Sequence, residues 1–302
     1  MNAPHPPPAH AAASRSALNA SARDTAGWGA AFDSAGQRGV FVLRRLGRPD
    51  SAGGPHDVYD RDAYPLAASD PVRARRPYLP ASTFKIPNSL LAFELGVVRD
   101  EQQWFPKTWP DASIAAWNRA YTFAGALAAS VVPIYQIVAR QVGEARYRTW
   151  LRRLDYGNAD PSGGVDHFWL DGALRTSAVQ QVDFLARLAA RRLPLSDRSQ
   201  LLVRGMMLRE AGATCAVYAK TGLVGPGSVR PVPADARVGW YVGWVETEGA
   251  HWAFALNVDA ERPGAAAARV PLAKALPARA GVDAAGSPPS PTITARCPRA
   301  RG

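Results

Sequence analysis

The spacing of hydrophobic residues changes twice along the chain and divides it into three regions. A short apolar run at 40–43 predicts a strand. Helical spacing then dominates and predicts helices over 82–95, 124–129, 134–154, 176–191 and 196–209. Runs rich in Val, Trp, Tyr and Phe follow, and they predict strands over 213–219, 238–247 and 252–259 before a last helix over 265–278.

This order of elements indicates a two-lobed α+β fold. An antiparallel sheet flanked by helices forms one lobe, and an all-helical lobe of about residues 80–210 is inserted into it. We expect one folded domain over 27–283. The segments 1–26 and 284–302 are rich in small residues and proline and have little to bury, so we expect them to be disordered or, at the N-terminus, processed.

Composition narrows the classes of protein without naming one. The chain has 302 residues, 47% of them hydrophobic, which is enough for a large core. It has no apolar run of about 18 residues, so we expect no membrane span. The net charge of +11 raises a nucleic-acid hypothesis. We favour no nucleic-acid partner, because the arginines are spread along the chain and no known nucleic-acid motif emerges.

Cysteine and histidine add little chemistry. The two cysteines, Cys215 and Cys297, do not make a disulfide framework, and the apolar run around Cys215 predicts a buried, inert thiol. The five histidines lack metal-ligand spacing, so we predict no metal. The N-terminal segment lacks the charged start and apolar core of a secretory signal.

Lysine is scarce, and its positions are informative. The chain has 32 arginines and only 4 lysines. Lys85 follows Ser82 by three residues, which places the amine and the hydroxyl on one face of a helical turn. Lys220 opens a Lys-Thr-Gly run that we expect to end a strand. Both arrangements occur in penicillin-recognising serine enzymes.

Each motif alone has an ordinary structural explanation. Four lysines give roughly a one-in-five chance that at least one serine precedes a lysine at this spacing. Ser130 directly follows the predicted helix over 124–129, and such a serine is usually a solvated residue at a helix end. The run from Lys220 to Gly222 is usually an ordinary turn after a strand. The order and spacing of the whole set carry the argument.

The set resembles the class D serine β-lactamases, the oxacillinases. The resemblance covers about residues 28–282 and is highly specific. The class A enzymes have S-D-N and the class C enzymes a tyrosine where this chain has Ser130-Val131-Val132. The matching segments are Pro-Ala-Ser-Thr-Phe-Lys-Ile-Pro-Asn-Ser at 80–89, Ser-Val-Val-Pro-Ile-Tyr-Gln at 130–136, Tyr-Gly-Asn at 156–158, Phe-Trp-Leu at 168–170, Lys-Thr-Gly at 220–222 and Gly-Trp-Tyr-Val-Gly-Trp at 239–244.

The resemblance implies catalytic roles for five residues. Ser82 would attack the β-lactam carbonyl and become acylated. Lys85 would be carboxylated by CO2 to N6-carboxylysine and act as the general base, held by the indole N–H of Trp169. Ser130 would pass a proton to the leaving lactam nitrogen, with Lys220 stabilising charge nearby. CO2 or bicarbonate would be the sole cofactor.

The resemblance also implies how the substrate is held. The backbone N–H groups of Ser82 and Leu223 would form the oxyanion hole. The remaining substrate-binding residues would be Thr221, Gly222, Arg269, Val132 and Leu170, with Thr221 and Arg269 binding the substrate carboxylate.

The activity implied is hydrolysis of penicillin-type β-lactams in the periplasm. The alternative is a slowly deacylating penicillin-binding sensor domain of the same fold. The range of β-lactams accepted and the oligomeric state have no signal in the sequence.

Overall fold

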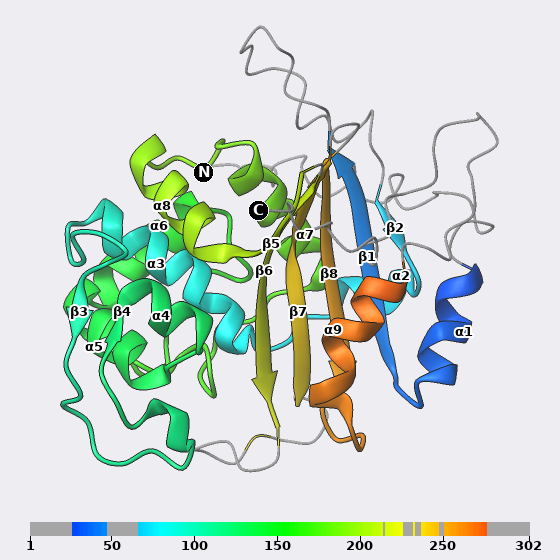
Figure 1. Cartoon of the computed structure of the whole chain (residues 1–302), viewed down its shortest axis with the longest axis horizontal. Helices are drawn as coiled ribbons and strands as arrows, with labels where there is room; N and C mark the ends of the chain where they lie inside the picture. The colour runs from blue at the N-terminus through cyan, green and yellow to red at the C-terminus, as the bar shows by residue number, and fades with distance from the viewer. Residues whose placement is uncertain are drawn as a thin grey trace, which may run out of the picture.

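A six-stranded antiparallel sheet lies at the centre of one lobe, in the order β2-β1-β8-β7-β6-β5 (Figure 1). The structure is a computed structural model that describes residues 26–46, 66–213, 215–225, 232, 237–247 and 251–276. The strands are β1 (Gly39–Leu46), β2 (Ala67–Ala68), β5 (Leu208–Ala211), β6 (Cys215–Val224), β7 (Val238–Thr247) and β8 (His251–Asp259).

Helices cover both faces of this sheet because its strands are apolar on both. In β1, Phe41 and Leu43 belong to one buried cluster, whereas Val40 and Val42 belong to the other. α1 (Ala26–Ser34) and α9 (Ala265–Ala275) cover the first face. α7 (Ala178–Ala189) and the short α2 (Pro71–Arg75) cover the second (Figure 1).

The second lobe is helical and is inserted between β2 and β5. Its centre is α3, in which every residue from Lys85 to Phe93 is buried. The predicted two-lobed fold class is confirmed, although the helical lobe also carries a two-stranded β3–β4 sheet. Its elements are η3 (Ala81–Phe84), α3 (Lys85–Glu94), β3 (Trp104–Phe105), η4 (Ala115–Trp117), β4 (Tyr121–Thr122), α4 (Phe123–Ala128), α5 (Val132–Val142), α6 (Glu144–Arg153) and α8 (Asp197–Met207).

Two of the predicted helices are wrong in extent. The single helix expected over 134–154 is two helices, α5 and α6, because Gly143 between them has a φ of 83° that a right-handed helix excludes. The helix expected over 196–209 ends at Met207, and the residues after it pair with β6 as the edge strand β5.

Two other expectations near β6 are also wrong. Lys220, Thr221 and Gly222 do not end a strand, because β6 continues to Val224 through its pairing with β7. Cys215, the first residue of β6, is partly exposed and disulfide-bonded rather than a buried free thiol. Cys297, like the segment 284–302, lies outside the described residues.

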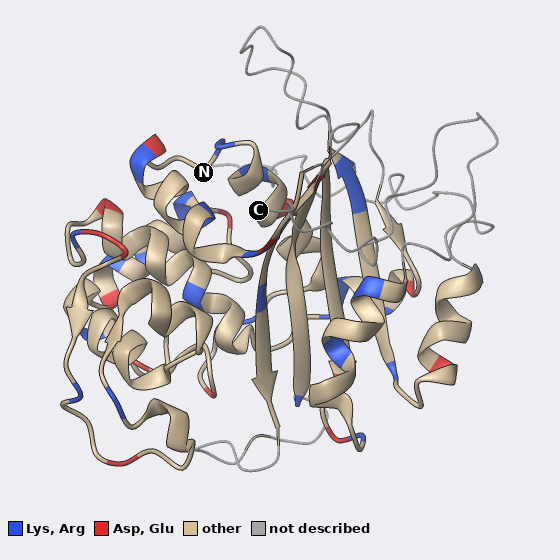
Figure 2. Cartoon of the chain, in the orientation of Figure 1, with Lys and Arg blue, Asp and Glu red and all other residues tan. Residues whose placement is uncertain are grey.

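Basic side chains are spread over the part of the chain that the structure describes (Figure 2). Lys and Arg are distributed over both lobes and do not gather on one element (Figure 2). None of the helices in the part of the chain that the structure describes is long and apolar enough to cross a membrane. The two lobes meet where η3 packs against β6, and the predicted catalytic residues lie around that junction.

Candidate active site

Ser82 and Lys85 lie on one tight turn at the start of the helical lobe. The turn is the 3₁₀ helix η3, which leads directly into α3. The Lys85 Nζ is hydrogen-bonded to the Ser82 Oγ at 2.8 Å. Ala81, just before the serine, has a φ of 51°, in the left-handed region that non-glycine residues seldom adopt. The backbone N–H of Ala81 donates to the Trp169 carbonyl at 3.0 Å, which helps to hold the turn in that conformation.

Burial makes the Lys85 amine suitable as a base. Its side chain is fully buried, and this desolvation lowers the pKa of Lys85 to about 7. The ring of Tyr135 lies 5.3 Å from the Nζ. A substantial fraction of the amine is therefore neutral near neutral pH, as reaction with CO2 or proton abstraction requires.

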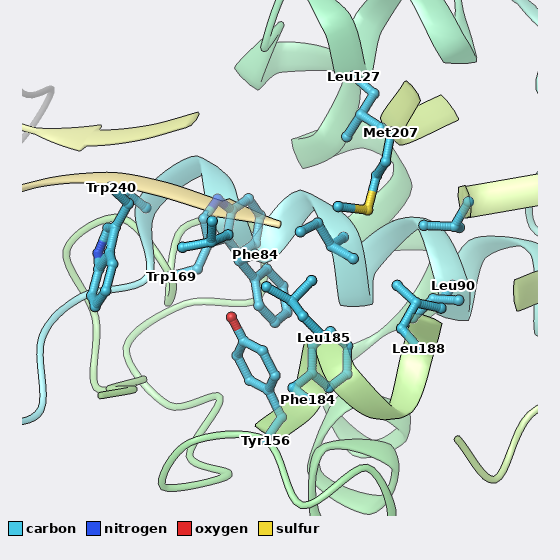
Figure 3. Packing of buried hydrophobic residues seen from close by; sticks show 14 of the residues in the cluster. Phe84, Leu90, Leu127, Tyr156, Trp169, Phe184, Leu185, Leu188, Met207 and Trp240 are labelled. Atoms are coloured by element: carbon cyan, nitrogen blue, oxygen red, sulfur yellow. The ribbon is translucent and has the colours of Figure 1, made fainter. Parts of the chain in front are cut away.

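Trp169 lies behind the nucleophile with an unused hydrogen-bond donor. Its ring stacks on Phe84 at 5.3 Å, and both side chains are fully buried (Figure 3). The buried indole Nε1 has no hydrogen-bond partner among the described residues. Since buried donors are nearly always paired, this indole N–H is available to an acceptor that binds or forms in the site.

A second serine–lysine pair is assembled from distant parts of the chain. The Lys220 Nζ in β6 is hydrogen-bonded to the Ser130 Oγ at 2.9 Å and to the Thr221 carbonyl at 2.9 Å. Ser130 lies between α4 and α5 with a φ of 59°. The backbone N–H of Ser130 donates to Leu127, and that of Val131 donates to Ala126, which fixes this conformation at the end of α4.

Lys220 is also buried, and its charge is further disfavoured by its neighbours. Only 2% of its surface is exposed, and burial lowers its pKa well below the usual value. The positive charges of Lys85, Arg209 and Arg269 lower it further. Each of the two serine hydroxyls is thus hydrogen-bonded to a lysine whose pKa is lowered. Several groups with shifted pKa values in one place are typical of active sites.

The C-terminal part of β6 comes close to the nucleophile turn at Gly222. A Cβ placed on Gly222 would lie 3.1–3.3 Å from Thr83 and the Pro80 carbonyl. The Trp240 Nε1 on β7 donates to the Leu79 carbonyl at 2.9 Å, which ties the sheet to the same turn. A glycine at position 222 therefore allows the two lobes to meet at the reactive hydroxyl.

Comparison with known proteins agrees with this geometry. The family profile "Penicillin binding protein transpeptidase domain" matches residues 57–278. The β-lactamase OXA-10 of Pseudomonas aeruginosa is 37% identical over 266 residues, covering 88% of this chain and 91% of that protein. The β-lactamase OXA-48 of Klebsiella pneumoniae is 50% identical over 187 residues, covering 62% of this chain and 68% of that protein.

A solved structure is similar as well. The crystal structure of the class D β-lactamase YbXI from Nostoc has a TM-score of 0.70 and 30% sequence identity, covering 81% of this chain and 94% of that one. The chain belongs to the class D β-lactamases. The predicted family is confirmed, and the protein is a hydrolase of the β-lactam amide bond.

For a class D β-lactamase, the least expected placement is that of Arg269. Its guanidinium, partly buried, donates to the Gly222 carbonyl through Nη1 and to the Ala266 carbonyl through Nε, the latter at 3.0 Å. A carboxylate clamp formed with Thr221 stays a prediction. The contacts seen tie α9 to Gly222 near the C-terminal end of β6, next to Thr221.

The other predicted substrate-binding residues line the same region to different degrees. Leu223 follows Gly222 on β6 and is 44% exposed, the most open of the predicted site residues. Val132, at the first turn of α5, and Leu170, next to Trp169, are partly buried. The exposure of Leu223 makes it the side chain best placed to meet solvent or a bulky substrate group.

Two supporting residues of this class D β-lactamase had no predicted role. Tyr135 lies within the segment matched at 130–136, but only the fold brings its ring to Lys85. Gln181 on α7 donates to the Thr83 Oγ1 at 2.8 Å, and that hydroxyl donates to the Pro80 carbonyl at 2.6 Å. Across the described ranges, no group of His, Cys, Asp or Glu side chains could hold a metal ion.

Proposed function

We propose that this class D enzyme hydrolyses penicillins through an acyl-enzyme on Ser82, with carboxylated Lys85 as the general base. The observation that carries the proposal is a buried amine with a pKa of about 7, hydrogen-bonded to Ser82 at 2.8 Å beside an unpartnered indole N–H. A carbamate on Lys85 supplies an anionic oxygen that accepts protons, and Trp169 is the residue that would hold it.

In acylation, the Ser82 Oγ forms a bond to the lactam carbonyl carbon, and the serine proton passes to the base on Lys85. The carbon–nitrogen bond breaks, and the Ser130 hydroxyl gives its proton to the leaving nitrogen. Lys220, 2.9 Å from the Ser130 Oγ, returns a proton to Ser130, and the proton held by the base on Lys85 then passes to Lys220, so that the base is free again for deacylation. The backbone N–H groups of Ser82 and Leu223 stabilise the carbonyl oxygen, each donor being worth about 3–4 kcal/mol.

In deacylation, water attacks the ester carbonyl from the side of Lys85. The base removes a proton from the water, and the proton returns to the Ser82 Oγ as the ester bond breaks. One water is consumed and one ring-opened acid is released. General-base help at such a step is worth about 10²–10⁴ in rate. A periplasmic location is part of the proposal and rests on the family alone.

Mass spectrometry of the intact protein mixed with a penicillin tests the nucleophile and turnover together. We expect one covalent adduct, located on Ser82 after digestion, that disappears as the substrate is consumed. An adduct that persists after excess penicillin is removed would favour the sensor-domain alternative. Absence of any adduct in wild type under single-turnover quench would contradict the proposal.

The contact between Trp169 and the base gives a second test. In Trp169→Ala the indole donor is lost, so we expect acyl-enzyme to accumulate and deacylation to slow by roughly 10²-fold. Trp28→Phe is the matched control, because Trp28 is also fully buried, with an indole N–H that has no partner among the described residues, but lies on α1 at the opposite face of the sheet. Wild-type deacylation in Trp169→Ala would remove Trp169 from the mechanism.

A further inference from the structure

The turn that carries Trp169 is closed by a side-chain pair that the mechanism does not use. His167 and Asp171 lie four residues apart, one on each side of Trp169. The His167 Nδ1 is 2.7 Å from the Asp171 Oδ1, and only 18% and 8% of the two side chains are exposed. The backbone between them forms a hydrogen-bonded turn, in which Leu170 and Asp171 both donate to the His167 carbonyl, at 2.8 and 3.2 Å.

The same turn is connected directly to the nucleophile. The Trp169 carbonyl accepts the 3.0 Å hydrogen bond from Ala81, the residue before Ser82. The Trp169 ring stacks on Phe84 on the other side of the serine. A shift of the turn would therefore move the indole N–H and the reactive hydroxyl together.

We propose that His167 is a positioning residue, which, paired with Asp171, fixes the turn so that the Trp169 indole can hold the carboxylated Lys85. This inference rests on the proposed function, because it concerns the group that Trp169 would bind. His167 does not touch the reacting atoms, and it acts by keeping Trp169 in place.

The surroundings of His167 favour this fixed orientation. The Asp166 Oδ1 lies 4.0 Å from the Nε2, so both ring nitrogens face a carboxylate. Arg140 on α5 pairs with the other oxygen of Asp166 at 2.5 Å. Gly164 leaves room for the ring, because a Cβ there would lie 2.1 Å from the His167 Nε2. The imidazole thus occupies a space shaped for it.

The test measures CO2 capture directly as well as activity. Wild type, His167→Ala and His167→Asn are depleted of CO2 and titrated with ¹³C-bicarbonate, and the carbamate signal is followed by NMR. We expect half-saturation in His167→Ala to need about 10-fold more bicarbonate, as when a residue that orients a binding group is removed. His167→Asn places an amide N–H near the Nδ1 position, so we expect it to recover most of the affinity.

Arg148→Gln is the control, since it removes an exposed ion pair with Glu144 on α6 and leaves the groups around His167 and Asp171 in place. We expect wild-type carbamate affinity in this control. Excess bicarbonate should restore the turnover rate of His167→Ala, which a misfolded site would not allow. Unchanged half-saturation in His167→Ala would overturn the role of His167 while leaving the carbamate mechanism standing. A wild-type protein with no ¹³C signal would overturn the carbamate mechanism and this inference with it.

Discussion

The site contains two serine–lysine pairs that are built in opposite ways. Ser82 and Lys85 are neighbours on one helical turn, so the spacing of the sequence alone places their side chains on one face, where they are hydrogen-bonded. Ser130 and Lys220 are 90 residues apart and meet only because β6 packs against the helical lobe. The first pair is a local property of the sequence, whereas the second is a property of the fold.

The two amines differ in what lowers their pKa. For Lys85 burial alone is the cause, which suits a group that must be neutral to capture CO2. For Lys220 burial is assisted by neighbouring positive charges, including that of Lys85. The pKa of Lys220 therefore depends on the charge at Lys85. A negative charge gained at Lys85 would raise the pKa of Lys220 and make it a better source of protons.

The largest expected effect comes from removing Lys85, because the two serine–lysine pairs act in different steps of the reaction. Lys85→Ala removes the base from both halves of the reaction, and we expect roughly a 10⁴-fold loss of turnover with any acyl-enzyme persisting. Ser130→Ala removes only the proton for the leaving nitrogen, and we expect roughly a 10²-fold slower acylation with little accumulation of adduct. Single-turnover kinetics with a penicillin distinguish the two patterns.

Lys274→Ala is the control for removing a lysine, because Lys274 pairs with Glu210 at the end of α9 and should leave turnover unchanged. If Ser130→Ala trapped acyl-enzyme as strongly as Lys85→Ala, the division of labour between the pairs would be wrong.

The second-largest expected effect is the pH dependence of CO2 capture by Lys85. Lys85 is protonated below its pKa of about 7, and only the neutral amine reacts. We expect reactivation of CO2-depleted enzyme to slow about tenfold for each pH unit below about 6 and to level off above about 8. Because burial alone lowers the pKa of Lys85, we expect Lys220→Met to leave this half-point unchanged. A rise in the half-point in Lys220→Met would show that the two amines repel each other.

The smallest effect concerns stability. A buried amine whose pKa falls on folding binds fewer protons in the folded state, so the free energy of unfolding rises with pH between about 7 and 10. Lys85→Met removes this cost, and we expect it to stabilise the CO2-free protein at pH 7 by on the order of 3 kcal/mol. Urea unfolding at pH 6, 7.5 and 9 measures both effects. A variant less stable than wild type at pH 6 would contradict the account.

The sequence predicted the Ser82–Lys85 pair and the fold class better than it predicted contacts between segments that are distant in the chain. The apolar runs identified β7 over 238–247 because Val, Trp and Tyr alternate through a strand buried on both faces. The break at Gly143 was missed, since the hydrophobic spacing continues across it and only the glycine signals the change. α1 was not predicted because its small residues show little periodicity.

Within the site, the resemblance supplied what spacing could not. No local pattern brings Ser130 to Lys220 or the Tyr135 ring to Lys85, because these contacts depend on how the lobes pack. Burial of the amines also follows from packing and could not be read from the motifs. For Trp169, the resemblance implied that its indole N–H holds the base on Lys85, and the structure shows this N–H without a partner among the described residues.

An unfavourable backbone conformation lies directly before one reactive serine, Ser82, and at the other, Ser130. Ala81 and Ser130 adopt positive φ, a conformation that costs a non-glycine residue about 1–2 kcal/mol. The surrounding hydrogen bonds must supply that energy, so the resting enzyme is less stable than its fold permits. A lineage freed from antibiotic selection would therefore gain stability by relaxing these two positions, and activity would be lost there before the scaffold changed.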